Sequence, residues 1–387
     1  MRALRHIAAT GWMVVAVGCA TPTLDRARQD YHSGRFDEAA RRLESKKTPE
    51  RDRVLVMMER GMSRQAAGDF EGSSRDFIDA FTEIDRMTAI SLTRDTGSMV
   101  INDQVQEFRG APFERTLLHS FTAKNHLMLS NWENAAVEAR RIIQSLAPEI
   151  KKDYPEDAYS RYMAGFCLSL IGDWSNAALQ YRLAQQHLPH LLIDERTGVI
   201  SPGTNQTTAA RYADAGQGPR ELVVFVLVGR SPRGEELLNP RYPLRAPGYA
   251  EIVVDGQTVG RSYALADTID LAFTTKEKDA FKETAKTISR IAAKEVIAYQ
   301  IDKENELLGA LFRIIMIGVL EQPDVRRWET LPRSLQVARV PLPETPETIE
   351  VLFRTGSAAN RRLTLPSELP RNGRTSIYVV RDNQPVL

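Results

Sequence analysis

Three ionisable residues in the first third of the chain, Glu114, Arg115 and His119, are the best candidates for a recognition site. Arg115 and His119 are four residues apart, so a helix would place both on one face. Such a cluster can form a charged surface that binds a partner protein. The alternative, which we favour because the charges nearly balance, is a buried ion-pair network in which Glu114 and Glu138 neutralise nearby arginines.

Enzyme signatures are missing from the sequence. It has no Gly-x-Ser-x-Gly motif, no His-Glu-x-x-His motif, no phosphate loop and no dinucleotide fingerprint. Cys19 and Cys167 are too few for a usual zinc cluster, and Pro189, between His187 and His190, ends the helix that would have paired these two histidines. We therefore expect no enzyme, no cofactor and no metal. The alternative is a cell-wall hydrolase with its site in the C-terminal part.

The N-terminal residues are arranged as in an exported protein. Met1 to His6 contains two arginines, Ile7 to Val17 is almost entirely apolar, and Gly18 precedes Cys19. A basic region, a short apolar run and small residues before a cut site are typical of a secretory signal. The run is shorter than the about 20 residues of a membrane-spanning helix.

With Cys19 after two small residues, this segment resembles a bacterial lipoprotein signal, although Ala16 stands where the family prefers leucine. The resemblance implies that residues 1–18 are removed, that Cys19 is acylated and that residues 19–23 form the anchor. Ala20 after the cysteine favours the outer membrane, by resemblance to enterobacterial lipoproteins. Two or three acyl chains anchor permanently, since each buried methylene contributes about 0.8 kcal/mol. An ordinary signal peptide with an incidental cysteine is the alternative.

The charge of the chain argues against a nucleic-acid partner. The formal net charge is +1, and removal of Arg2 and Arg5 with the signal leaves about −1. Nucleic-acid binders usually carry a basic excess or stripe. The hydrophobic fraction of 42% is ordinary for a globular protein.

Four segments in the first half share one pattern: a helix, a small-residue turn, an aromatic residue and a second helix. The turns lie at Gly34, Gly68, Ser130 and Gly172, and small residues also stand seven positions before each turn. Small residues let paired helices approach closely, and one pair cannot bury its apolar face alone. The residues expected to pack the pairs are Gly34, Phe36, Gly68, Phe70, Trp132, Ala135, Gly172, Trp174 and Ala177.

This pattern resembles the tetratricopeptide repeat over residues 24–190. The first two turns are 34 residues apart, which is the period of that family. The later spacings of 62 and 42 residues predict an insertion near residues 87–112 and a loop near residues 147–156. An unrelated helical bundle is the alternative.

The second half of the chain has a different character. Residues 191–220 are rich in Gly, Pro, Ser and Thr, and we predict a linker there. Residues 221–387 are predicted as a domain with a small, mostly antiparallel sheet and two helices. The fold class is therefore α+β, with an N-terminal α-helical repeat array followed by an α+β domain. Strands are expected at residues 221–228, 250–254, 257–259, 334–340, 348–353 and 375–380, and helices at 276–300 and 304–320, with residues 264–268 leading into the first of these helices.

The two halves are expected to dock. The last predicted repeat has no polar capping helix, so its apolar face needs cover near Tyr181, Leu188 and Pro189. Trp328, beside two arginines, is interpreted as a residue that packs between domains rather than as a carbohydrate platform.

Several longer stretches carry a wider resemblance: residues 113–119, 134–141, 218–225, 328–333, 336–339 and 341–343. Through them the chain resembles a family of uncharacterised bacterial lipoproteins with tetratricopeptide-like repeats. Members are often grouped with lipoproteins that activate penicillin-binding proteins. The resemblance implies export and a repeat scaffold, but no activity.

The functional hypothesis is a lipid-anchored scaffold on the bacterial outer membrane that faces the periplasm. It would bind an envelope protein partner in cell-envelope or cell-wall assembly. A structural subunit of an envelope complex is the alternative. The oligomeric state is left open.

Overall fold

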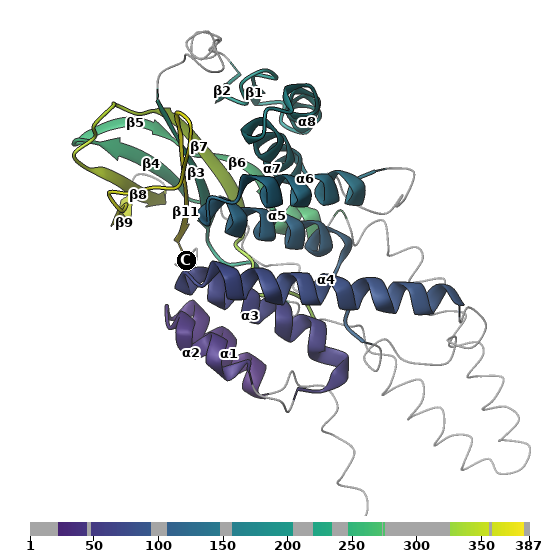
Figure 1. Ribbon diagram of the computed structural model, residues 1–387. Helices are drawn as coiled ribbons and strands as arrows, with labels where there is room; N and C mark the ends of the chain where they lie inside the picture. The colour runs from purple at the N-terminus through teal and green to yellow at the C-terminus, as the bar shows by residue number, and fades with distance from the viewer. Residues whose placement is uncertain are drawn as a thin grey trace, which may run out of the picture.

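The computed structural model describes residues 22–44, 48–93, 107–147, 157–203, 220–233, 247–272, 274, 326–355 and 358–382. In these ranges the chain is mixed α and β, with helices in the first half and strands in the second. Figure 1 shows the helices stacked from α1 to α8, with the sheets to one side. The helices are α1 (Pro22–His32), α2 (Phe36–Arg42), the short 3-10 helix η1 (Glu50–Asp52), α3 (Arg53–Ala67), α4 (Phe70–Thr93), α5 (Pro112–Met128), α6 (Trp132–Ser145), α7 (Ala158–Leu170) and α8 (Trp174–Gln185). The strands are β1 (Leu191–Ile193), β2 (Ile200–Pro202), β3 (Glu221–Val228), β4 (Tyr249–Val254), β5 (Gln257–Arg261), β6 (Tyr263–Asp267), β7 (Ser334–Pro341), β8 (Ile349–Thr355), β9 (Ala358–Thr364), β10 (Arg371–Asn372) and β11 (Thr375–Asp382).

Each predicted turn lies between two helices that pack against each other: α1 and α2, α3 and α4, α5 and α6, α7 and α8. The backbone is left-handed at all four turn positions, with φ of +79° at Gly34, +89° at Gly68, +56° at Ser130 and +79° at Gly172. Glycine adopts this conformation without a steric penalty. The left-handed backbone therefore favours glycine at three of these turns, and Ser130 adopts it as a non-glycine residue.

Small residues also permit the close contact within the pairs. A Cβ atom added at Gly61 in α3 would lie 2.5 Å from the ring of Phe77 in α4. At Gly165 in α7 it would lie 3.0 Å from the ring of Tyr181 in α8. These aromatic rings occupy space that a larger residue in the first helix would need.

Replacement of Gly172 with valine is expected to lower the free energy of unfolding by about 1–3 kcal/mol. The cost is conformational, because φ is +79° and the nearest atom to an added Cβ is Nε1 of Trp174, at 3.9 Å. Urea unfolding of the two proteins measures it. The matched control is Ser130→Gly, which relieves a left-handed non-glycine residue and should leave stability equal or higher. An unchanged midpoint for Gly172→Val would contradict the strained-turn argument.

The strands form two sheets and a separate hairpin. The order is β10-β11-β3-β7-β6 in one sheet and β5-β4-β8-β9 in the other, and β1 pairs with β2. Among the strand pairs described, β11 and β3 run parallel and the others run antiparallel. The single sheet of the sequence analysis is therefore wrong, because apolar residues on both faces of β3 support two layers beside it.

Strand β3 is the central element of this layering. Leu222, Val224 and Val226 pack with residues of the second sheet, including Ile252. The alternate residues of β3 face the other way and pack with the helices: Val223, Phe225 and Leu227. Since alternate strand residues point to opposite faces, the layers are helices, five-stranded sheet and four-stranded sheet.

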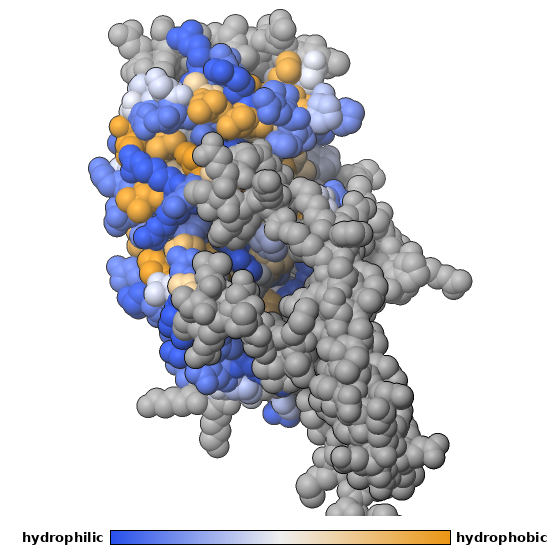
Figure 2. Space-filling model, turned by 90° about the vertical axis from the view of Figure 1, so that its right-hand side faces the viewer, coloured by the Kyte–Doolittle hydropathy of each residue, from blue (hydrophilic) through white to orange (hydrophobic). Residues whose placement is uncertain are grey.

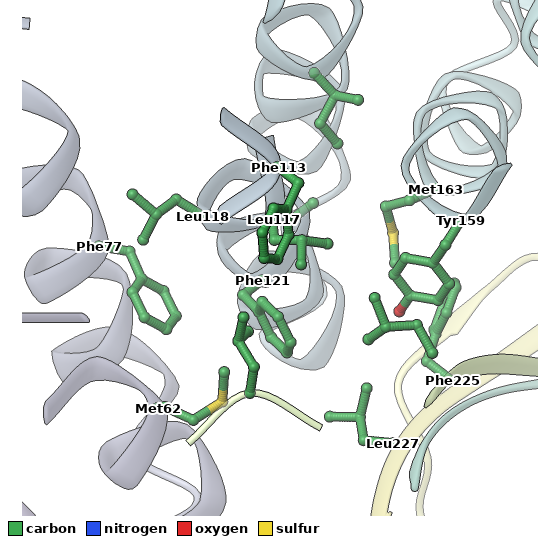
Figure 3. Close-up of a cluster of buried hydrophobic side chains, with 14 of the residues drawn as sticks. Met62, Phe77, Phe113, Leu117, Leu118, Phe121, Tyr159, Met163, Phe225 and Leu227 are labelled. Atoms are coloured by element: carbon green, nitrogen blue, oxygen red, sulfur yellow. The ribbon is translucent and has the colours of Figure 1, made fainter. Parts of the chain in front are cut away.

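A continuous hydrophobic core joins the helices to the five-stranded sheet. It extends from Leu24 in α1 to Ile377 in β11. Figure 3 shows Phe77 and Phe121 of the helices on one side of this core and Phe225 and Leu227 of β3 on the other. The helical and strand-rich parts therefore share buried apolar surface.

Part of the predicted linker is ordered structure. Residues 191–203 contain the β1–β2 hairpin, which packs on α8. The amide of Gln185 donates to the carbonyl of Leu191 at 2.8 Å and accepts from the N–H of Ile193 at 2.6 Å. The loop-like composition gives no sign of this hairpin, because its contacts with Gln185 are made by main-chain groups, which every residue type has.

Several predictions fall outside the described residues. These are the signal segment with Cys19, most of the predicted linker (residues 204–219) and the predicted helices 276–300 and 304–320. Helix α4 runs to Thr93, so it takes up the start of the predicted insertion. None of the helices in the described ranges combines the length and apolarity needed to cross a membrane.

Candidate functional site

The candidate site is the place where residues 326–331, called the strap below, lie against the helices. The strap belongs to no described helix or strand and leads into β7. Its contacts reach α1, α3 and α5, which are the first helices of three of the pairs. The site therefore brings together residues more than 200 positions apart in the sequence.

Two buried carboxylates bind the main chain of the strap. Glu114 in α5 accepts from the N–H of Trp328 at 2.9 Å. Glu59 in α3 accepts from the N–H of Glu329 at 3.1 Å and of Thr330 at 3.2 Å. Burial raises the pKa of Glu114, since a carboxylate loses hydration there. Hydrogen-bond donors from the strap compensate for that loss.

Trp328 fills the space between two aromatic rings. Its indole is fully buried. The ring centroid lies 5.5 Å from the centroid of Phe77 and 5.5 Å from that of Phe121, in edge-to-face geometry. Such pairs add to the hydrophobic gain of burying a large ring. This residue therefore packs between the two halves, as the sequence analysis expected.

Two arginines, one in the strap and one in α1, add charged hydrogen bonds between the strap and the helices. Arg326 donates to Asp52 at 2.9 Å and lies 5.8 Å from the ring of Phe108. Arg28 in α1 donates to Glu59 and, at 2.8 Å, to the main-chain carbonyl of Arg327. Charged hydrogen bonds in buried surroundings are stronger than neutral ones.

The three residues of the predicted recognition cluster point in different directions. Glu114 is 1% exposed and binds the strap, while His119 is 3% exposed and bonds through Nδ1 to Glu138 at 2.8 Å. Arg115 donates to the carbonyls of Arg109 and Gly110 before α5. Glu114 and His119 therefore do not form a solvent-facing surface.

The predicted packing residues occupy several environments. Ala135 and Ala177 are buried, Phe36 and Trp132 pack against the core, and Phe70 is partly buried. Trp174 is a correction, because its side chain is 50% exposed. Trp174 begins α8, and α8 is the last helix of the stack in the described residues, so no further helix pair follows it there.

A second interface joins the five-stranded sheet to the helices. Within the sheet, Arg339 in β7 donates to both carboxylate oxygens of Glu221 in the neighbouring β3, at 2.7 and 2.8 Å. Burial alone would raise the pKa of Glu221, but Arg339 holds it below its usual value. Arg381 of β11 donates to the hydroxyl of Tyr31 in α1, and Asn372 donates to the carbonyl of Leu170 in α7 at 2.9 Å. The docking thus extends well beyond the last helix pair.

Lys124 is the most unusual ionisable group that the sequence analysis missed. Its side chain is fully buried, with Nζ 3.1 Å from the hydroxyl of Tyr159 and 3.5 Å from the ring centre of Phe121. Burial lowers its pKa well below the usual value. A neutral amine can act as a base, but full burial denies it a substrate. The sequence feature that could have indicated its burial is helical spacing, because Lys124 lies seven residues after Leu117 and three after Phe121, which are both buried.

Of the two cysteines, only Cys167 lies in the described residues. Cys167 is a buried free thiol, and burial raises its pKa, so it is a poor nucleophile. Across the described ranges, His, Cys, Asp and Glu side chains do not gather in threes that could hold a metal ion.

Comparison with known proteins gives no relative: no family model matches the chain, and no curated protein matches it.

Proposed function

We propose that the chain is a lipid-anchored, periplasm-facing scaffold of the bacterial outer membrane. Its tetratricopeptide-like helical array binds a protein partner that acts in cell-envelope or cell-wall assembly. The supporting observation is the repeated geometry of four helix pairs, each with a left-handed turn at the predicted position. Stacked pairs of this kind present extended surfaces suited to protein ligands.

The large apolar side chains that are exposed in the described residues lie on the helices or at their ends. They are Ile78 in α4, Leu129 at the end of α5, Val137 in α6, and Trp174 and Leu179 in α8. In Figure 2 the coloured part of the face has apolar residues interspersed with hydrophilic ones. Isolated apolar residues of this kind are ordinary on a water-exposed surface.

Substitution of Cys19 with serine tests the anchor. The variant keeps nearly the same side-chain size but loses the thiol that would carry the lipid, so it should disappear from the membrane fraction. Cys167→Ser is the matched control, because that buried thiol has no part in anchoring and the variant should stay with the membrane. A Cys19→Ser protein that remains with outer membranes after a salt wash would mean that a lipid on Cys19 is not the tether.

Capture of partners tests the scaffold itself. The acylated protein, crosslinked mildly in membranes and purified, should enrich a small set of envelope proteins. An empty capture would count against the proposal, and a stable homo-oligomer alone would favour the structural-subunit alternative.

A further inference from the structure

The proposed lipid anchor lies very close to the folded body. Cys19 is only three positions before Pro22, the first residue of α1. An extended chain spans at most about 3.6 Å per residue, so the start of α1 lies within about 11 Å of Cys19. A lipid on Cys19 would hold that residue at the bilayer surface. The anchored protein would therefore have the start of α1 at the lipid headgroups, with no linker that lets the body stand away.

The start of α3 lies level with the start of α1. These two helices run in the same direction, because each leads through a turn into a returning helix. Arg28 in α1 donates to Glu59 in α3 at 2.8 Å, and this contact sets their relative height. Six residues before the contact, α1 begins at Pro22 and α3 begins at Arg53. Both starts therefore face the bilayer when the short tether is anchored.

Helix α4 extends beyond this level. It runs antiparallel to α3, and its Asp76 accepts from Arg60 of α3 at 3.0 Å. On this register Arg53 lies near the level of Ile84, whereas α4 continues to Thr93. At 1.5 Å per residue, the last turns of α4 project past the starts of α1 and α3 by about 13 Å. Figure 1 shows this end of α4 reaching past both helices.

The projecting end of α4 lies on the same side of the stack as the tether. The opposite ends of the first helices face the five-stranded sheet: Arg381 in β11 donates to Tyr31 near the end of α1, and Asn372 donates to the carbonyl of Leu170, the last residue of α7. The projection of α4 and the maximum reach of the tether are also similar in length. The end of α4 can therefore meet the headgroups while the turns and sheets point away from them.

The composition of this end suits a headgroup layer. Residues 87–93 contain no charged residue. The other surface close to the tether is the outer face of α2, which exposes Asp37, Glu38 and Arg41. Uncharged side chains enter the headgroup region readily, whereas anionic lipids repel acidic ones. The end of α4 is therefore better suited than α2 to rest on the bilayer.

We propose that the end of α4 is a second contact with the lipid bilayer and orients the protein on the membrane. The helices then point their α4 end at the headgroups, and the turns between paired helices face the periplasm together with the sheets. The proposal rests on the proposed function, because only a lipid on Cys19 brings this end of the stack to the membrane. It deepens that function by assigning the surfaces that stay open to a protein partner.

Contact-range fluorescence quenching in vesicles tests this orientation. The acylated full-length protein carries one labelled cysteine, from Ala89→Cys near the end of α4, Ser175→Cys at the start of α8 or Glu38→Cys on α2, all at exposed positions. Cys167 is buried and should take up no label, which the protein without a new cysteine checks. The vesicles contain phosphatidylethanolamine and phosphatidylglycerol, with or without a lipid that has a nitroxide on its headgroup. The label at position 89 should lose most of its fluorescence to the nitroxide, and the labels at positions 175 and 38 should lose almost none.

Flotation of the vesicles before each measurement separates the possible failures. Protein that floats with the vesicles but shows no quenching at position 89 would overturn the α4 contact and leave the anchor intact. Equal quenching at positions 89 and 175 would also overturn it, and quenching mainly at position 38 would mean that α2 rests on the bilayer instead. Acylated protein that does not float would overturn the anchor and this contact together.

Discussion

Replacement of Trp328 with alanine is expected to lower the free energy of unfolding by about 3–5 kcal/mol. The indole is fully buried and touches rings from α4 and α5, while its main chain is fixed by Glu114. Removal of the ring leaves a cavity between helices whose positions are set by their own pairs. Because the walls cannot collapse fully, the cavity cost adds to the lost hydrophobic burial.

Denaturant unfolding of the variant and the wild type measures this effect. Trp174→Ala is the matched control, because that indole is 50% exposed and its removal should cost about 1 kcal/mol or less. Equal losses for the two variants would mean that Trp328 does not join the helices to the strap as described.

Features that depend on neighbouring residues were predictable from the sequence. The apolar run of β3 predicted a buried strand, and its predicted bounds agree with the structure. Asp255 and Gly256 predicted a tight hairpin turn, and both residues have positive φ, of +50° and +79°. Such patterns suffice because the relevant physics acts within a few residues.

The candidate site was hidden because its partners are distant in the chain. Glu114 stood out as a charged residue, but the N–H that it accepts belongs to Trp328, 214 positions away. The sequence analysis did not single out Glu59, whose contact to Thr330 spans 271 positions. Spacing along one helix cannot indicate which distant main-chain groups a carboxylate will meet.

The same limitation explains the error at Trp174. A turn aromatic packs against the next helix pair when one follows, but α8 is the last helix of the described stack and a short hairpin follows it. The local pattern is the same at Trp132, which does pack against the core. The burial of the ring depends on where the helix pair lies in the stack, and the local sequence pattern does not contain this information.

The helices and the sheets form one body, joined by the strap, Arg381 and the apolar face of β3. The most direct test is cleavage between the halves. A protease site placed within residues 204–219, which join β2 to β3 in the sequence, lets the chain be cut without touching these contacts. The two fragments should co-elute from a sizing column at the volume of the intact protein and separate only in denaturant. Elution as two folded, independent fragments in native buffer would contradict the account.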